Sequence, residues 1–108
     1  MSRIKELEAM LETNPDDPFI IYALAREYEH SLATMQALLM YEHLITDHPT
    51  YIATYYHYAK ILYSAGNKNE GIRMLERGIE WGLKETDMHA VSEMKSLLSS
   101  WTQEDDED

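Results

Sequence analysis

Apolar residues recur along most of this chain at spacings of three and four residues, with polar residues between them. This spacing places the apolar side chains on one face of a helix. The pattern stops where turn-forming residues cluster, as in NPDDP at 14–18 and SAGNKN at 64–69. It therefore predicts an all-α fold of about six helices. They are expected near residues 2–13, 17–31, 34–47, 51–64, 68–81 and 87–101.

The chain also resembles itself when it is shifted by 34 residues. Under this shift Pro15 aligns with Pro49, and Ala25 aligns with Ala59. A helical repeat of this length indicates a supersecondary unit that buries its apolar face against the next unit in a stack.

Large apolar and small residues follow one another in the same order in both repeats. In residues 18–49 the order is Ile21, Leu24, Ala25, Tyr28, Ala37, Tyr41, Leu44 and Pro49. In residues 52–83 it is Tyr55, Tyr58, Ala59, Leu62, Gly71, Leu75 and Gly78, with Leu83 where Pro is expected. This order resembles the signature of the tetratricopeptide repeat proteins. The resemblance implies a right-handed stack of antiparallel helical hairpins, an α-solenoid whose first helices line a concave groove.

The repeat divides the chain into one domain, residues 1–101, and a short tail. The expected parts of the domain are a half-repeat helix at 1–15, repeats at 16–49 and 50–84, and a capping helix at 85–101. The tail, residues 102–108, holds five acidic residues. Because like charges repel one another, the tail is expected to be disordered. It is interpreted as a solubility tail, with docking to a basic partner as the alternative.

Small residues are expected where the two helices of a hairpin cross, because the backbones approach closely only there. The expected pairs are Ala25 with Ala37, and Ala59 with Gly71. The turn of the first hairpin carries Leu32 where the second carries Gly66. A left-handed backbone costs a non-glycine residue about 1–2 kcal/mol, so the first turn is expected to differ from the turn of the family that the chain resembles.

Four tyrosines lie in the nine residues 55–63. Tyr55 and Tyr58 fall on stripes that face the hairpin partner and the neighbouring repeat, so both are predicted to be core. Tyr56 and Tyr63 lie on a third stripe, which helix packing does not require. The resemblance places this stripe, and its equivalent one repeat earlier, in the concave groove. The predicted peptide-binding residues are Phe19, Tyr22, Arg26, Tyr56, Lys60 and Tyr63. The alternative is that Tyr56 and Tyr63 are partly buried packing.

The charge and composition exclude several classes of function. The 108 residues hold 20 Asp and Glu against 9 Lys and Arg, a net charge of −11, which argues against a nucleic-acid partner. The absence of cysteine excludes disulfides and thiol chemistry. No apolar run approaches the ~20 residues of a membrane-spanning helix, and the amino terminus does not read as a secretory signal. A cytoplasmic location, with no membrane partner, is the simplest expectation.

Catalytic and metal-binding motifs have little support. No Gly-rich phosphate loop or Ser-His-Asp arrangement is recognisable, so no enzyme activity and no cofactor are predicted. His43 and Asp47 lie one helical turn apart with His48 beside them, which is a spacing that metal ligands can use. A solvated helix end is the favoured interpretation, and no metal site is predicted.

The sequence therefore predicts a non-enzymatic protein–protein interaction module. It is expected to hold an extended or helical peptide segment of a partner protein in an aromatic-lined concave groove. The alternative is a homo-oligomeric structural or assembly scaffold, such as a homodimer that pairs through its exposed edges. The identity of the partner stays open.

Overall fold

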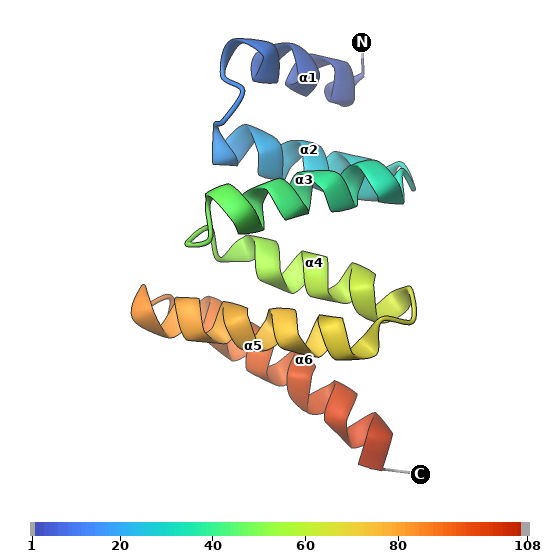
Figure 1. Cartoon of the computed structure of the whole chain (residues 1–108), viewed down its shortest axis with the longest axis vertical. Coiled ribbons are helices and arrows are strands. Elements are labelled where there is room, and N and C mark those ends of the chain that lie inside the picture. Colours follow the sequence, from blue (N-terminus) through green and yellow to red (C-terminus); the bar gives the residue numbers. More distant parts are fainter. Residues whose placement is uncertain (1, 107–108) are drawn as a thin grey trace. The chain divides into compact units, whose positions relative to one another are not determined.

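The computed structural model describes residues 2–106, and all of their regular secondary structure is α-helical (Figure 1). The predicted all-α class is thus confirmed. The helices of this part of the chain are α1 (Arg3–Thr13), α2 (Pro18–His30), α3 (Thr34–Asp47), α4 (Ala53–Ser64), α5 (Lys68–Lys84) and α6 (Met88–Asp106). The first four agree with the predicted ranges to within two residues at either end.

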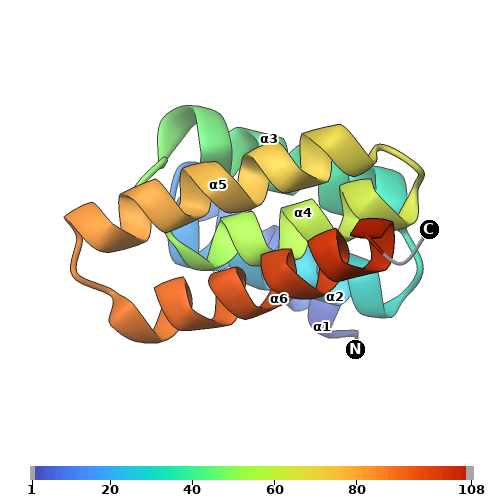
Figure 2. The ribbon, with the colours of Figure 1, turned by 90° about the horizontal axis from the view of Figure 1, so that it is seen from below.

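The chain forms two compact units, residues 1–51 and residues 52–108. In the first unit, α2 packs against both α1 and α3. In the second, α5 packs against both α4 and α6 (Figure 2). Each unit therefore holds one predicted hairpin and one further helix. The prediction of a single domain over residues 1–101 stays a prediction.

The core of the first unit is built from the apolar stripes of its three helices. Leu7 of α1 is buried with Ile20 and Leu24 of α2, and half-buried apolar residues surround them. Ala25 and Ala37 are both fully buried, as expected for small residues in this hairpin. Burial of such stripes is the main favourable contribution to folding.

The core of the second unit depends on glycines, which let neighbouring helices approach closely. A Cβ atom added at Gly71 would lie 3.0 Å from the carbonyl oxygen of Ala59, which confirms the predicted close approach of α4 and α5. A Cβ added at Gly78 would lie 2.5 Å from both the Met94 Sδ and the Tyr55 Cβ. Gly78 is therefore the point at which α5 admits Tyr55 from α4 and Met94 from α6.

The first hairpin turn has the same form as the second, so the prediction of a different turn at Leu32 is wrong. Leu32 adopts φ 62° and Gly66 adopts φ 94°. The N–H of Ala33 donates to the Tyr28 carbonyl at 2.8 Å, and that of Asn67 donates to the Leu62 carbonyl at 2.9 Å. These bonds satisfy carbonyls that the helix end would leave open. Leu32 is 87% exposed, so the turn carries the left-handed strain without burying its apolar side chain.

Two helices end later than predicted. α5 continues to Lys84 because Gly82 is buried inside the helix, where an added Cβ would lie 2.7 Å from the Val91 Cγ2. α6 continues to Asp106, past the predicted end at Trp101. Residues 102–106 of the expected disordered tail are thus helical, since neither Gly nor Pro interrupts the helix there; residues 107–108 lie outside the described residues. Among the helices described, none combines the length and the apolar character needed to cross a membrane.

Replacing Leu32 with Gly should raise the free energy of unfolding. The substitution removes the left-handed strain and exposes no buried surface, and both effects favour the folded state. Glycine is also more flexible in the unfolded chain, which lowers the free energy of unfolding by part of that amount. We expect a net stabilisation of about 0.5–1 kcal/mol in urea unfolding. Ala33 has φ −88°, so Ala33→Gly serves as the control and should destabilise. A Leu32→Gly protein that is less stable than wild type would contradict the assignment of strain to this turn.

Candidate functional site

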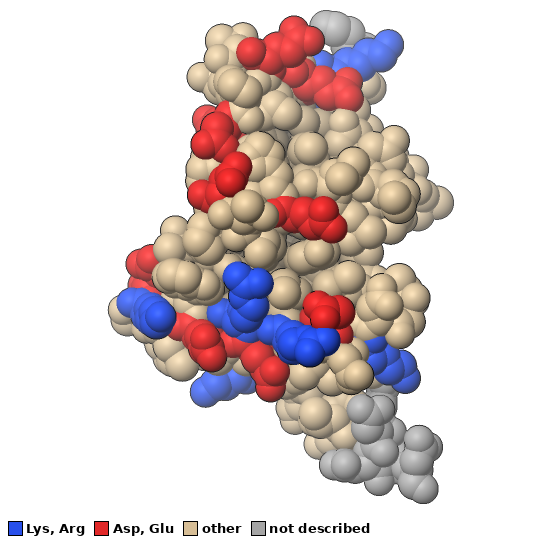
Figure 3. Space-filling model, in the orientation of Figure 1, with Lys and Arg blue, Asp and Glu red and all other residues tan. Residues whose placement is uncertain are grey.

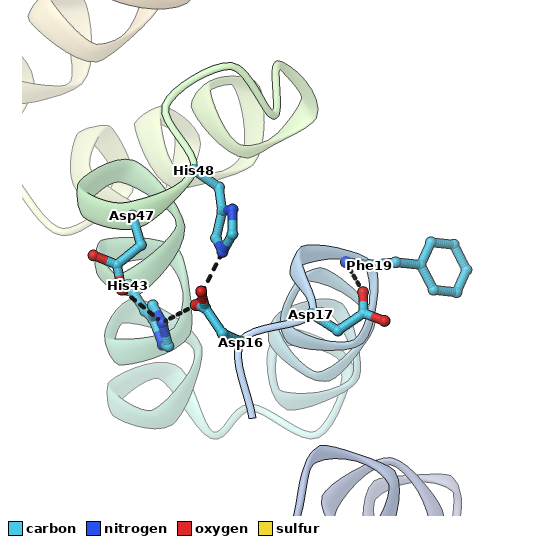
Figure 4. Close-up of polar contacts among 6 residues, drawn as sticks. All are labelled: Asp16, Asp17, Phe19, His43, Asp47 and His48. Carbon is cyan, nitrogen blue, oxygen red and sulfur yellow. Dashed lines mark hydrogen bonds and ion pairs between the residues drawn. The ribbon is translucent and has the colours of Figure 1, made fainter. Parts of the chain in front are cut away.

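The exposed side of α2 carries the first group of predicted binding residues. Phe19 is 66% exposed, and its ring points away from α2 (Figure 4). The helix starts beside it because the Asp17 carboxylate accepts a hydrogen bond from the Phe19 N–H at 2.9 Å. The half-buried Tyr22 ring lies 5.4 Å from the Tyr51 ring and 6.5 Å from the Tyr41 ring, centroid to centroid. Burial raises the pKa of the Tyr22 hydroxyl above its ordinary value.

Arg26 extends this side of α2 by one turn, but it already has a partner within the chain. Its Nη1 lies 3.2 Å from the Glu29 Oε1. The same carboxylate oxygen accepts a hydrogen bond from the Tyr41 hydroxyl. Burial, together with this hydrogen bond, raises the pKa of Tyr41. A ligand carboxylate at Arg26 would therefore have to compete with Glu29.

Tyr56 and Lys60 form the corresponding surface on α4. The Lys60 Nζ lies 5.2 Å from the centroid of the half-buried Tyr56 ring, a cation–π geometry. The His57 ring meets the Tyr56 ring edge-on at 5.3 Å. Lys60 itself is exposed. The two side chains thus present an aromatic surface with a cation beside it.

Tyr63 has a different environment from Tyr56. Its ring stacks on that of Trp101 in α6 at 4.0 Å, with only 7° between the planes. Trp101 is 7% exposed, so the stack is part of the packing of α6 in the second unit. The Lys68 Nζ also lies 5.5 Å from the Tyr63 centroid. The contacts of Tyr63 therefore support the alternative that this residue is partly buried packing rather than a peptide-binding residue.

A polar cavity of about 390 Å³ lies next to Tyr56, between α4 and α6. The residues lining it are Tyr56, His89, Ser92, Glu93, Ser96 and Leu97. Within its wall, the His89 Nε2 lies 3.3 Å from the Glu93 Oε1. The sequence missed these α6 residues because α6 does not follow the repeat and was predicted only as a capping helix. No sequence signal identified which side of α6 would meet Tyr56.

A separate cluster of histidines and carboxylates lies in the first unit (Figure 4). The Asp16 Oδ1 lies 3.1 Å from the His43 Nε2 and 3.0 Å from the His48 Nε2. The His43 Nε2 also lies 3.0 Å from the Asp47 Oδ2. Hydrogen bonds from His48 and His43 lower the pKa of Asp16. Among the described residues, Asp16, His43 and Asp47 have the donor atoms and the proximity to hold a metal ion.

The sequence paired His43 with Asp47 and His48 but missed Asp16. Asp16 precedes α2 by two residues and is far from α3 in the chain. Only the folding of the first unit brings this linker to the end of α3.

Acidic residues dominate the surface around these groups. Residues 1–51 hold nine Asp and Glu against three Lys and Arg, and residues 52–108 hold eleven against six. The face drawn in Figure 3 shows mainly acidic side chains on the first unit and both signs on the second. The first unit is therefore the more acidic of the two in proportion to its basic residues.

The fold and the repeat are also those of known structures. The solution structure of a tetratricopeptide repeat domain protein from Salinibacter ruber is 31% identical, with a TM-score of 0.76. The match covers 80% of this chain and 87% of that one. This chain belongs to the tetratricopeptide repeat family. The resemblance noted in the sequence is thereby confirmed.

Two further solved structures bear on the fold. A crystal structure of a tetratricopeptide repeat domain protein from Salinibacter ruber matches with a TM-score of 0.75 and 31% identity, over 78% of this chain and 93% of that one. A protein from Bordetella parapertussis has the same fold at 23% identity, with a TM-score of 0.83, over 97% of this chain and 91% of that one. No family model and no curated protein matches the chain. As a tetratricopeptide repeat protein, it is a helical-repeat module of the kind that mediates protein interactions.

Replacing Tyr63 with Ala should destabilise the protein by about 2 kcal/mol, because it removes the stack on Trp101 and leaves a space between α4 and α6. Tyr63→Phe keeps the ring and should remain within about 0.5 kcal/mol of wild type. Urea unfolding of the two variants beside wild type measures both effects. Equal stability of Tyr63→Ala and Tyr63→Phe would show that the stack does not support the second unit.

Proposed function

We propose that this chain is a non-enzymatic interaction module that holds a peptide segment of a partner protein on the face of α4 that carries Tyr56 and Lys60. The observation that carries the proposal is the pair Tyr56 and Lys60 beside the polar cavity between α4 and α6. Aromatic side chains with a nearby cation are typical of the residues that dominate binding energy at protein interfaces.

The surroundings of Tyr56 suit a peptide better than an apolar small molecule. The hydroxyls of Ser92 and Ser96 and the His89–Glu93 pair offer donors and acceptors to a peptide backbone. The Tyr56 ring offers apolar contact area at a small entropic cost. Lys60 is placed to meet a carboxylate or backbone carbonyls of the bound segment.

The α2 face lies in the first unit and is a separate surface of a different kind. Phe19 is exposed and offers apolar area, whereas Arg26 is held by Glu29. A partner with a basic side chain could pair with Glu29, and one with a carboxylate could take Arg26 from it. A charged group of a partner can therefore bind to this face only if the Arg26–Glu29 pair is broken. Apolar contact with Phe19 and Tyr22 does not require this, so it is the favoured mode of binding.

Substitution of Tyr56 by Ala should weaken peptide binding strongly. Peptides are selected against the wild-type chain from a displayed random library, and the best is titrated by calorimetry. Loss of an interface anchor costs 2 kcal/mol or more, so we expect about a 30-fold loss of affinity for Tyr56→Ala. Lys60→Ala should weaken binding less, because an exposed charge contributes little in water. Glu76→Ala, on the exposed side of α5, is the matched control and should bind as wild type.

Melting curves separate binding from folding in this experiment. Tyr55 is fully buried, so Tyr55→Ala should lower stability by about 3 kcal/mol or more, whereas Tyr56→Ala should lower it much less. Selected peptides that bind Tyr56→Ala as tightly as wild type would contradict the proposal, because the binding surface would then lie elsewhere.

A homo-oligomeric scaffold is a second candidate, and one surface favours it. Leu32, Met35 and Leu39 are 87%, 71% and 58% exposed, and they follow one another at three and four residues. Met35 and Leu39 therefore lie on one face at the start of α3, and Leu32 lies in the turn just before the helix; together these exposed side chains are called the apolar stripe. An exposed apolar stripe of this kind is typical of an interaction surface, and a second copy of the chain presents the same stripe.

Light scattering coupled to size-exclusion chromatography tests this candidate across a range of protein concentrations. If the stripe pairs two copies, the average mass should rise with concentration towards twice the 12.6 kDa of one chain. The double variant Met35→Lys with Leu39→Lys should then stay monomeric, because burying charges in the contact is costly. Glu42→Lys, exposed on the same helix, is the charge-matched control. A mass that stays at one chain throughout would eliminate the scaffold.

A further inference from the structure

The cluster at Asp16 brings together side chains from two distant segments of the first unit. Asp16 lies in the linker between α1 and α2, while His43 and Asp47 lie in the last turns of α3. Their ligand atoms all lie within 4.8 Å of one another. Figure 4 shows the Asp16 carboxylate between the rings of His43 and His48, with Asp47 on the far side of His43. The cluster uses none of the residues assigned to peptide binding.

We propose that Asp16, His43 and Asp47 form a binding site for a divalent transition-metal ion of the zinc type. Zinc ligands lie about 2.1 Å from the ion in a tetrahedral site, which sets the ligand atoms roughly 3.4 Å apart. The His43 Nε2 lies 3.1 Å from the Asp16 Oδ1 and 3.0 Å from the Asp47 Oδ2. Each of these two distances is within a few tenths of an ångström of the value that the ion requires, and the Asp16 and Asp47 oxygen atoms lie within 4.8 Å of one another.

The chemistry of the donors selects the class of ion. An imidazole nitrogen is a good ligand for zinc, nickel and cobalt, whereas calcium and magnesium prefer sites made of oxygen atoms. Two carboxylates balance the charge of a divalent ion. The acidic excess of residues 1–51 favours cations in general, and two of the three basic residues there, Arg3 and Arg26, pair with Glu27 and Glu29.

His48 acts as a positioning residue in this site. Its Nε2 lies 3.0 Å from the Asp16 Oδ1 and can donate a hydrogen bond to that carboxylate. Metal-binding carboxylates are commonly oriented by such a second hydrogen bond, and its loss costs roughly 10–100-fold in metal affinity. With three protein ligands, a fourth position stays open to water or to a group from a partner.

Metal binding at this site would join the α1–α2 linker to the end of α3. Because the ligands are together only in the folded state, bound metal stabilises that state by mass action. The proposed ion is thus a clamp on the first unit, independent of whether α2 and α4 bind a peptide.

The test is calorimetric titration of the full-length chain with zinc chloride after removal of metals with EDTA. We expect binding close to one ion per chain and a rise in melting temperature on adding zinc. His43→Ala should weaken zinc binding by more than about 100-fold, since it removes a ligand. His48→Ala should weaken it by about 10–100-fold, and His48→Gln, which keeps an N–H donor, should restore much of that loss.

The chain supplies a matched control in α6. His89 and Glu93 are a histidine and a carboxylate one helical turn apart, with 3.3 Å between the Nε2 and Oε1 atoms, as in His43 and Asp47. His89→Ala should leave zinc binding unchanged, because that pair lacks the third ligand. If His43→Ala fails to fold in EDTA, the exposed Asp47→Asn takes its place with the same expectation. Equal affinity of wild type and the His43 or Asp47 variant, or an equal loss in His89→Ala, would overturn the proposal.

Discussion

The close approach of paired helices is the constraint on which the rest of the structure depends. It is possible only where side chains are small, at Ala25 and Ala37 in the first unit and at Ala59 and Gly71 in the second. At Gly78, not even a methyl group would fit between the Tyr55 and Met94 side chains. Because the crossing points are fixed, each helix has a defined buried stripe, and the direction of every other side chain follows from the helical period.

This constraint separates neighbouring tyrosines into different roles. Tyr55 follows the buried stripe and is fully enclosed, while Tyr56 is turned one residue further and lies beside Lys60 and a polar cavity. Tyr63 shares the stripe of Tyr56 in the helical period, yet it stacks on Trp101. Its role is decided by α6 rather than by α4. The surface available to a partner is therefore set jointly by the helix that carries the residue and by the helix that packs beside it.

The sequence predicted those features that depend on local spacing. The helices and the small residues at the crossings follow from patterns within one hairpin. Leu32 was judged wrongly because intrinsic preference for glycine was given more weight than the hydrogen bonds that close the turn. The fifth helix was predicted to end at residue 81, but it continues through Gly82, whose missing side chain allows Val91 to pack there. In both cases a tertiary contact or a set of backbone bonds outweighed local propensity.

The features that the sequence could not predict are those assembled from segments far apart in the chain. The cavity beside Tyr56 needs α6, which does not follow the repeat, and the cluster at His43 needs Asp16 from the α1–α2 linker. Both groups are polar and partly exposed, so the packing that fixes the helices does not by itself require these side chains. A residue that folding does not require, but that the fold nevertheless brings within bonding distance of others, is a reasonable place to look for function. Tyr56 and His43 are both residues of this kind. The proposed peptide surface and the proposed metal site share none of their residues, so they are two independent properties of one chain.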